Sequence, residues 1–203
     1  MKKSAVIFLF ASTLLFAENF NAEEIKISNN LTEKIHEKES DFFSITPQTS
    51  KKKRYFICKC ENFEIPYEKG LGILLDYPDY ENRFRYIAKS QNKGGGYYFF
   101  TLGVPLVKSR LWGEIEENLG ENRAKISFTQ TKKDVIYPDS SKSMITIDFD
   151  KFVLQWNLLK IDEKNSRFCL TGAAQPEKDV PQWLVKTALK KIIPRTLKNI
   201  NDK

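Results

Sequence analysis

The chain has 203 residues, a length that suits one sizeable domain with its own hydrophobic core. Aromatic residues are plentiful, with 15 Phe, 8 Tyr and 3 Trp, so the chain can fill a large apolar interior. This content argues against disorder of the whole chain. The formal net charge is +7, from 33 Lys and Arg against 26 Asp and Glu.

The first residues resemble a secretory signal peptide. Lys2 and Lys3 form a short basic region, and an almost unbroken apolar run follows from Ala5 to Ala17. The run is short for a membrane span, although an uncleaved anchor is the alternative. We expect residues 1–17 to be removed, with Ala22 as another candidate for the last residue of the peptide. Cutting after Ala17 lowers the net charge from +7 to +5. The prediction is an exported protein, periplasmic or secreted.

Export makes a disulfide possible, and the chain has three cysteines. Cys58 and Cys60 lie two apart in a predicted strand, with Cα atoms roughly 6.6 Å apart and side chains that point the same way. That geometry is poor for a bond between them. Either one could meet Cys169 if their strands pair, and one thiol is left over in any case.

The middle and end of the chain predict an α+β domain over 41–203, after a flexible or partly helical segment over 18–40. Helices are expected from Pro66 to about Asp76, from Tyr80 to Phe84 and from Asp179 to Ile200. A glycine turn at 94–96 lies within a long antiparallel meander. Strands are expected at 41–47, 55–63, 85–90, 97–102, 107–116, 124–130, 144–149, 152–159 and 167–172.

Alternation along the strands indicates a sheet with one buried and one wet face. In 107–116, for example, Leu111 and Ile115 share one face while Arg110 and Trp112 share the other. The last helix has Asp179 as its expected N-cap and Pro181 in its first turn. Its residues at helical spacing, which we expect to face the sheet, are Trp183, Leu184, Ala188 and Ile192. Pro194 should kink this helix or divide it.

Three passages resemble START-like domains, the StAR-related lipid transfer or helix-grip superfamily. Glu64-Ile65-Pro66 through Leu74-Leu75-Asp76-Tyr77-Pro78-Asp79-Tyr80 is similar to the family's strand, helix and tyrosine turn. Val104 to Arg110 resembles a proline-to-arginine turn, although the arginine is one position late and the acid is missing. Asp179 to Leu197, with Pro-Gln-Trp-Leu-Val and Pro-Arg-Thr-Leu, is close to the family's ending.

The resemblance implies a helix-grip fold, in which a curved antiparallel sheet wraps around a long C-terminal helix. It also implies an apolar ligand, often a lipid, held between that helix and the sheet. With the sheet curled in this way, the expected ligand contacts are Ser109, Leu111, Ile115, Phe128, Gln130, Leu154, Trp156, Leu170, Trp183, Leu184 and Ile192. The alternative for each apolar residue is to fill a core. For Ser109 and Gln130 the alternative is a hydrogen bond to nearby backbone.

No catalytic or metal motif supports an enzyme. The only histidine is His36, in the weakly patterned N-terminal region, and three scattered cysteines make no zinc pattern. The predicted function is lipid binding, with possible transfer and without a cofactor. The alternatives are a cyclase or hydrolase on the same fold, with Asp148, Asp150 or Arg110 turned inward, and an interaction protein that binds partners through Trp112. Lysines on the last helix could touch an anionic membrane surface. The spread of the basic charge, together with export, argues against nucleic acid.

Overall fold

In the computed structural model, residues 42–46, 54–104, 107–131, 145–178 and 180–201 are described. The predicted signal peptide, the 18–40 segment and the expected N-cap Asp179 lie outside these ranges. None of the described helices is long and apolar enough to cross a membrane.

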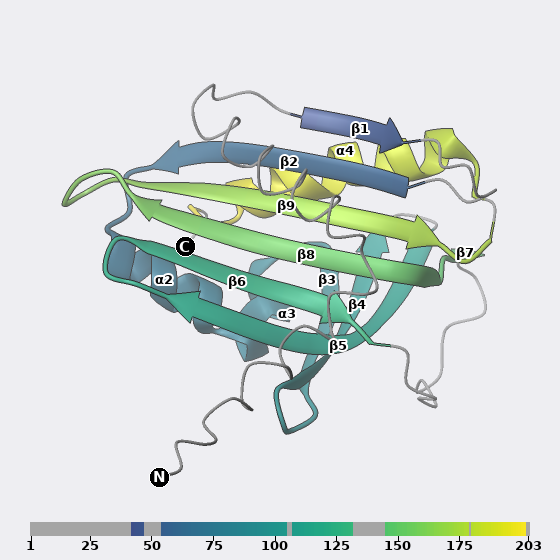
Figure 1. Ribbon diagram of the computed structural model, residues 1–203, viewed down its shortest axis with the longest axis horizontal. Helices are drawn as coiled ribbons and strands as arrows, with labels where there is room; N and C mark the ends of the chain where they lie inside the picture. The colour runs from purple at the N-terminus through teal and green to yellow at the C-terminus, as the bar shows by residue number, and fades with distance from the viewer. Residues whose placement is uncertain (1–41, 47–53, 105–106, 132–144, 179, 202–203) are drawn as a thin grey trace, which may run out of the picture.

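The nine strands of the described residues form one sheet, and eight of them follow the order β1-β2-β9-β8-β6-β5-β4-β3, in which all neighbours are antiparallel (Figure 1). The short β7 lies off this path and pairs with β5 in parallel. The strands are β1 (Phe42–Thr46), β2 (Arg54–Phe63), β3 (Ile87–Asn92), β4 (Tyr97–Val104), β5 (Val107–Leu119), β6 (Arg123–Gln130), β7 (Ile145–Thr146), β8 (Phe149–Lys160) and β9 (Ser166–Pro176).

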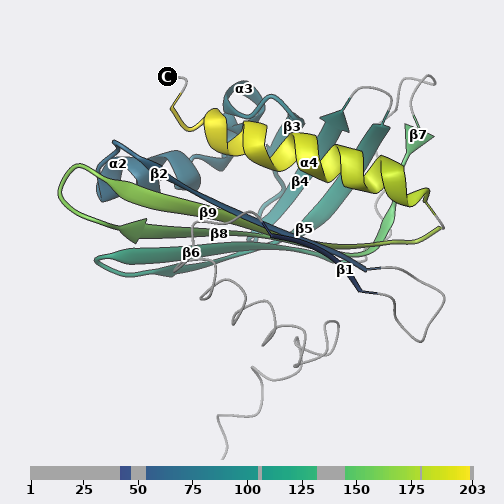
Figure 2. The same ribbon diagram turned by 90° about the horizontal axis from the view of Figure 1, so that it is seen from above.

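The helical segments lie on one side of this sheet, and β3 and β4 rise toward them from the layer of β6, β8 and β9 (Figure 2). The segments are α2 (Tyr67–Leu75), the 3₁₀ turn η2 (Tyr77–Asp79), α3 (Tyr80–Arg83) and α4 (Gln182–Lys198). The α+β class and the antiparallel curved sheet with a C-terminal helix are therefore confirmed. The sheet curves because its strands twist, and the curve leaves a concave face for the helices to cover.

Local sequence explains where the first helices begin and end. Pro66 occupies the N-cap position of α2, and Asp76 caps its C-terminal end before Pro78. The predicted helix from Pro66 to about Asp76 is thus confirmed. Gly70 lets α2 approach the sheet closely, since a Cβ there would lie 2.7 Å from Cζ of Phe168.

The glycine turn between β3 and β4 also follows from backbone preferences. Gly94, Gly95 and Gly96 all have positive φ, at 81°, 59° and 79°, a region that side chains with a Cβ rarely adopt. The side chain of Asn92 accepts a hydrogen bond from the Gly94 N–H at 2.7 Å. The predicted turn is confirmed, and it joins the two strands that form the far edge of the sheet.

Helix α4 has Pro181 at its N-cap, so the prediction that Asp179 caps it was wrong and the helix begins at Gln182. The body of the helix differs from the sequence prediction in two further ways. It runs as one helix through Pro194, so of the two effects predicted for this proline, a kink or a division, the division was wrong. Ile193 and Leu197, on either side of the proline, are almost fully buried, and this packing holds both halves in one helix. The second difference concerns Trp183, which is 67% exposed instead of facing the sheet.

Candidate functional site: an apolar cavity

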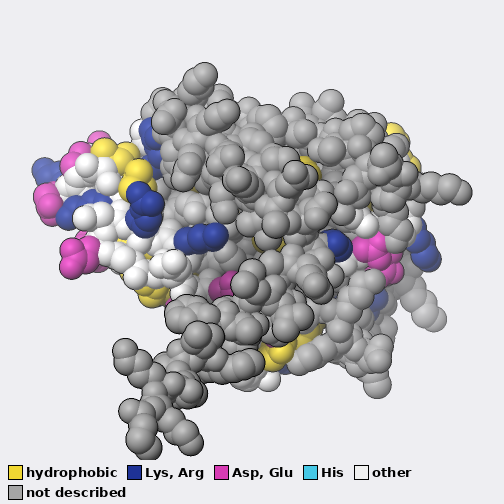
Figure 3. Space-filling view, viewed as in Figure 1, with side chains coloured by type: hydrophobic (Ala, Val, Ile, Leu, Met, Phe, Trp, Pro, Cys, Tyr) yellow, Lys and Arg dark blue, Asp and Glu magenta, His cyan; other side chains and the backbone are white. Residues whose placement is uncertain are grey.

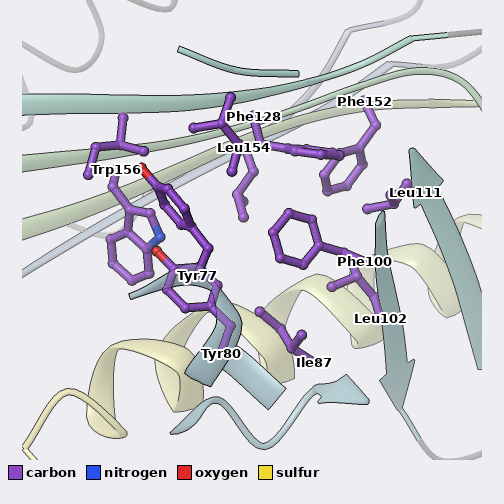
Figure 4. A pocket seen from close by; sticks show the side chains of 12 residues that line it. Tyr77, Tyr80, Ile87, Phe100, Leu102, Leu111, Phe128, Phe152, Leu154 and Trp156 are labelled. Carbon is purple, nitrogen blue, oxygen red and sulfur yellow. The ribbon is translucent and has the colours of Figure 1, made fainter. Parts of the chain in front are cut away.

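A cavity of about 30 Å³ lies between the sheet and the segment made of η2 and α3. Its lining comes from η2, α3 and strands β3, β4, β5, β6 and β8, which converge on one space (Figure 4). The lining residues that the structure describes are Tyr77, Tyr80, Ile87, Phe100, Leu102, Leu111, Ile115, Ile126, Phe128, Phe152, Leu154 and Trp156. All of them are aliphatic or aromatic.

The cavity is small because aromatic rings fill most of the concave face. Phe100 packs edge-on against Phe128 with ring centroids 5.1 Å apart, and Phe128 lies 6.4 Å from Phe152. At the other end, Tyr80 contacts Phe84. A volume of about 30 Å³ is far below the roughly 300–1,000 Å³ of pockets that hold drug-sized ligands. A lipid can enter only if some lining side chains move.

Three of the lining residues are only half-buried: Leu102, Ile115 and Leu154. They pack against the core without being sealed in it. Because an exposed side chain changes rotamer more easily than one that is locked in a close-packed interior, these three are the side chains most able to make room.

Two tyrosine hydroxyls stand at one end of the cavity, and both are already hydrogen bonded. Tyr77 donates to Oε1 of Glu117 at 2.6 Å, and Tyr80 donates to the carbonyl oxygen of Leu74 at 2.6 Å. Burial raises the pKa of both tyrosines, and for Tyr77 the hydrogen bond to the Glu117 carboxylate raises the pKa further. Both therefore stay protonated and neutral at physiological pH.

The structure brings five of the predicted ligand contacts to the cavity: Leu111, Ile115, Phe128, Leu154 and Trp156. The other sheet positions lie elsewhere. Ser109 and Leu170 are buried, but neither belongs to the described lining. Gln130 donates from Nε2 to the backbone oxygen of Phe149 at 3.0 Å, which is the structural alternative considered for it.

The α4 positions also lie away from the described lining. Leu184 and Ile192 pack against a second, smaller cluster that contains Tyr86 and Ile147. Trp183 points outward for a geometric reason. It precedes Leu184 by one residue, which is about 100° around a helix, so it cannot share the face of Leu184 and Ile192.

Seven lining residues were not among the predicted contacts. Ile126 and Phe152 were recognised as inward-facing by alternation, but not chosen as contacts. Phe100 and Leu102 lie on the predicted aromatic strand over 97–102, where alternation places them on the same face. Ile87 carried none. Tyr77 and Tyr80 were visible in the Asp-Tyr-Pro-Asp-Tyr passage, but there the turn pattern concealed that both rings point into the interior.

Acid and base groups lie outside the described lining. Asp148 is exposed, and Asp150 accepts a hydrogen bond from Nε2 of Gln175 at 3.4 Å. Arg110 occupies the strand position next to Leu111, so its side chain leaves the opposite face of β5. Within the described ranges, no group of three or more His, Cys, Asp or Glu side chains could hold a metal ion.

Charges of both signs alternate at the end of the sheet where the β5–β6 and β8–β9 turns lie (Figure 3). Lys160 pairs there with Glu163 at 2.9 Å, and Lys59 pairs with Glu61 at 3.2 Å on β2. Such mixing gives no field of a single sign on this visible part of the surface.

Comparisons with known proteins agree with this architecture. Human STARD10 superimposes with a TM-score of 0.61 at 11% identity, covering 85% of this chain and 77% of its own. Human StAR-related lipid transfer protein 5 gives a TM-score of 0.57 at 8% identity, covering 90% of this chain and 97% of its own. This chain has a START-like fold. No protein-family model and no curated protein matches the sequence.

The START-like fold is also used by an enzyme. The Zhui aromatase/cyclase from Streptomyces sp. R1128 gives a TM-score of 0.51 at 12% identity, covering 72% of this chain and 88% of its own. The fold alone therefore does not distinguish a binding protein from an enzyme. That distinction depends on the residues that line the cavity.

Proposed function

We propose that this protein binds a lipid or another apolar small molecule in the cavity of its START-like fold. The observation that carries the proposal is the lining of that cavity, in which all twelve described side chains are aliphatic or aromatic. An enzyme of the cyclase or hydrolase kind needs acid and base groups in contact with its substrate. The described lining provides no carboxylate, imidazole or amine, and its two tyrosine hydroxyls already donate to protein acceptors.

Burial of hydrocarbon provides the driving force. A ligand that hides about 300 Å² of apolar surface gains roughly 7 kcal/mol at 25 cal/mol per Å². Part of this gain is lost to the freedom that the ligand gives up and to the displacement of Leu102, Ile115 and Leu154. We therefore expect affinities in the micromolar range and a slow step in which the cavity widens.

The three tryptophans allow a direct test, since only Trp156 lines the cavity. Trp183 is exposed, and Trp112 extends from the opposite face of β5 to Leu111. In the Trp112→Phe/Trp183→Phe variant, titration with 1-bromododecane should quench the fluorescence of Trp156 in a saturable way, because bromine quenches on contact. The matched Trp112→Phe/Trp156→Phe variant keeps Trp183 and should show no saturable quenching.

The same experiment can overturn the proposal. If 1-bromododecane leaves the fluorescence of Trp156 unchanged, and protein purified from its own host carries no lipid by mass spectrometry, the interior is a packed core. If the protein then captures a partner, and Trp112→Ala abolishes this capture, the alternative of an interaction protein is favoured.

The proposal includes export and transfer across an aqueous compartment. The apolar run over 5–17 supports it, and so does the disulfide between Cys60 and Cys169, since such bonds persist in oxidising compartments. We expect the protein outside the cytoplasm, with Glu18 or Glu23 as its first residue by intact mass. A full-length chain in the cytoplasmic fraction would contradict export.

A further inference from the structure

One polar atom of the cavity lining makes no hydrogen bond within the described part of the chain. Trp156 is 4% exposed and lines the cavity, and its indole N–H has no hydrogen-bond partner among the described residues. In Figure 4 the nitrogen lies on the edge of the ring that is turned toward Tyr77 and Tyr80. This nitrogen is not among the fully enclosed, unpaired side-chain atoms of the described residues, so it borders open space and can donate a hydrogen bond to a group placed there.

The neighbouring hydroxyls complete a small polar end. Tyr77 and Tyr80 use their hydrogens on Glu117 and on the backbone of Leu74, but each oxygen keeps the capacity to accept. The end near Trp156 therefore offers one donor, the indole N–H, and two acceptors. A ligand hydroxyl can accept from the indole and donate to a tyrosine, and a ligand carbonyl can accept from the indole.

An ionised headgroup does not fit this end. The described lining contains no lysine or arginine to pair with a carboxylate or phosphate. The Glu117 carboxylate lies directly behind Tyr77 and would repel an anion. Burying a charge without a partner is far more costly than burying a neutral oxygen that is hydrogen bonded.

We infer that the ligand is a neutral lipid with one hydroxyl or carbonyl oxygen, and that this oxygen accepts a hydrogen bond from Nε1 of Trp156. The rest of the ligand is hydrocarbon and lies along Phe100, Phe128 and Leu154. This inference rests on the proposed function and adds the chemical class of the ligand.

The indole N–H signals of the three tryptophans report the contact directly in ¹⁵N–¹H spectra, with assignment by single Trp→Phe variants. Dodecanol and 2-tridecanone should each shift the Trp156 signal in a saturable way, since a hydroxyl and a carbonyl oxygen can both accept from the indole. Tridecane, which has no oxygen, should leave the signal without the downfield shift of a new hydrogen bond. The Trp183 signal serves as the internal control, because Trp183 is exposed on α4.

A cycle of two ligands and two proteins measures the strength of the contact and cancels the hydration of each ligand. The ratio of dodecanol affinity to tridecane affinity should fall by about fivefold in Trp156→Phe, the size expected for one hydrogen bond. Trp183→Phe should leave this ratio unchanged. If Trp156→Phe fails to fold, the spectral test on the wild-type protein still decides the inference.

The outcomes separate this inference from the proposed function. Binding of tridecane and dodecanol with no downfield Trp156 shift, and with the same affinity ratio in Trp156→Phe, overturns the inference and leaves apolar binding intact. A Trp156 shift with dodecanoate equal to that with dodecanol overturns the requirement for a neutral ligand. Failure of 1-bromododecane and all of these ligands to bind overturns the proposed function and the inference together.

Discussion

Gly113 shows how a single residue sets the room inside the sheet. A Cβ at this position would lie 2.7 Å from Cζ of Phe128 and would clash with the backbone oxygen of Thr129. The Phe128 ring therefore rests over β5 at the place where Gly113 has no side chain. Since Phe128 lines the cavity, this glycine also fixes one of its walls.

Gly113→Ala should lower the free energy of unfolding by about 3 kcal/mol, because the backbone oxygen of Thr129 cannot move aside without breaking the pairing of β5 with β6. Urea denaturation measures the change. Gly72→Ala is the matched control, as a Cβ on this exposed position of α2 meets nothing within 4 Å. The control should stabilise by about 0.5–1 kcal/mol, since alanine favours a helix over glycine. Equal effects at the two glycines would show that neither the Thr129 backbone nor Phe128 closes the space beside Gly113.

The buried tyrosines predict sensitivity to alkali. Burial raises the pKa of Tyr77 and Tyr80 above the ordinary value of 10.0, so the folded chain keeps protons that the unfolded chain loses. The stability from these hydroxyls is fully present below about pH 10 and is lost as the pH rises further. The melting temperature should fall as the pH rises above about 10, and less steeply in Tyr77→Phe/Tyr80→Phe. An unchanged slope would mean that other groups cause the loss.

Among the elements, the strands were the most predictable because their side chains alternate. The alternation of 107–116 and 152–159 placed Leu111, Ile115, Leu154 and Trp156 on the inner face, and all four line the cavity. What alternation cannot supply is the position along a strand. Ser109 and Leu111 have the same parity, yet only Leu111 reaches the described lining, because the cavity occupies one stretch of the concave face.

Helix α4 was harder to predict because its packing, and not its sequence alone, decides its contacts. Leu184 and Ile192 meet Tyr86 and Ile147, while Ile193 and Leu197 join the main core. The helix therefore crosses from one cluster to the other, which a single apolar stripe could not reveal. Pairings between distant segments were also undetermined by the sequence, and the choice between Cys58 and Cys60 as the partner of Cys169 is one example.

The disulfide between Cys60 and Cys169 links β2 to β9 across a sequence separation of 109 residues. The two strands are neighbours in the sheet but lie far apart in the sequence, so the bond restricts the unfolded chain strongly. Cys60→Ser/Cys169→Ser should lower the free energy of unfolding by about 2–5 kcal/mol in urea denaturation. Cys58→Ser, two residues away on the same strand, leaves the bond intact and should cost about 1 kcal/mol.

A reducing agent provides the converse test of this bond. It should destabilise the wild-type protein about as much as the double substitution does, and it should have no further effect on the double variant. An unchanged urea midpoint in the double variant would contradict a structural role for the bond.

In the molecule as a whole, the same residues form the core and the proposed binding site. Phe100, Phe128 and Trp156 belong to the main hydrophobic cluster and also line the cavity. The protein without ligand therefore has little empty space, and a ligand must replace contacts that the protein makes with itself. The proposed ligand therefore loses part of its binding free energy to the internal contacts that it displaces.

Ligand-dependent stability distinguishes a cavity that opens from a core that is filled. A ligand present at ten times its dissociation constant adds about 1.4 kcal/mol to the free energy of unfolding if it binds only the folded chain. For a chain of this size that is a rise of roughly 3–6 °C in melting temperature. Dodecanol should produce this rise in calorimetry. In Leu154→Phe the larger ring takes up the space that half-buried Leu154 leaves, so the same dodecanol concentration should raise the melting temperature by less than about 1 °C. Equal rises in both proteins would place the bound alcohol somewhere other than the cavity.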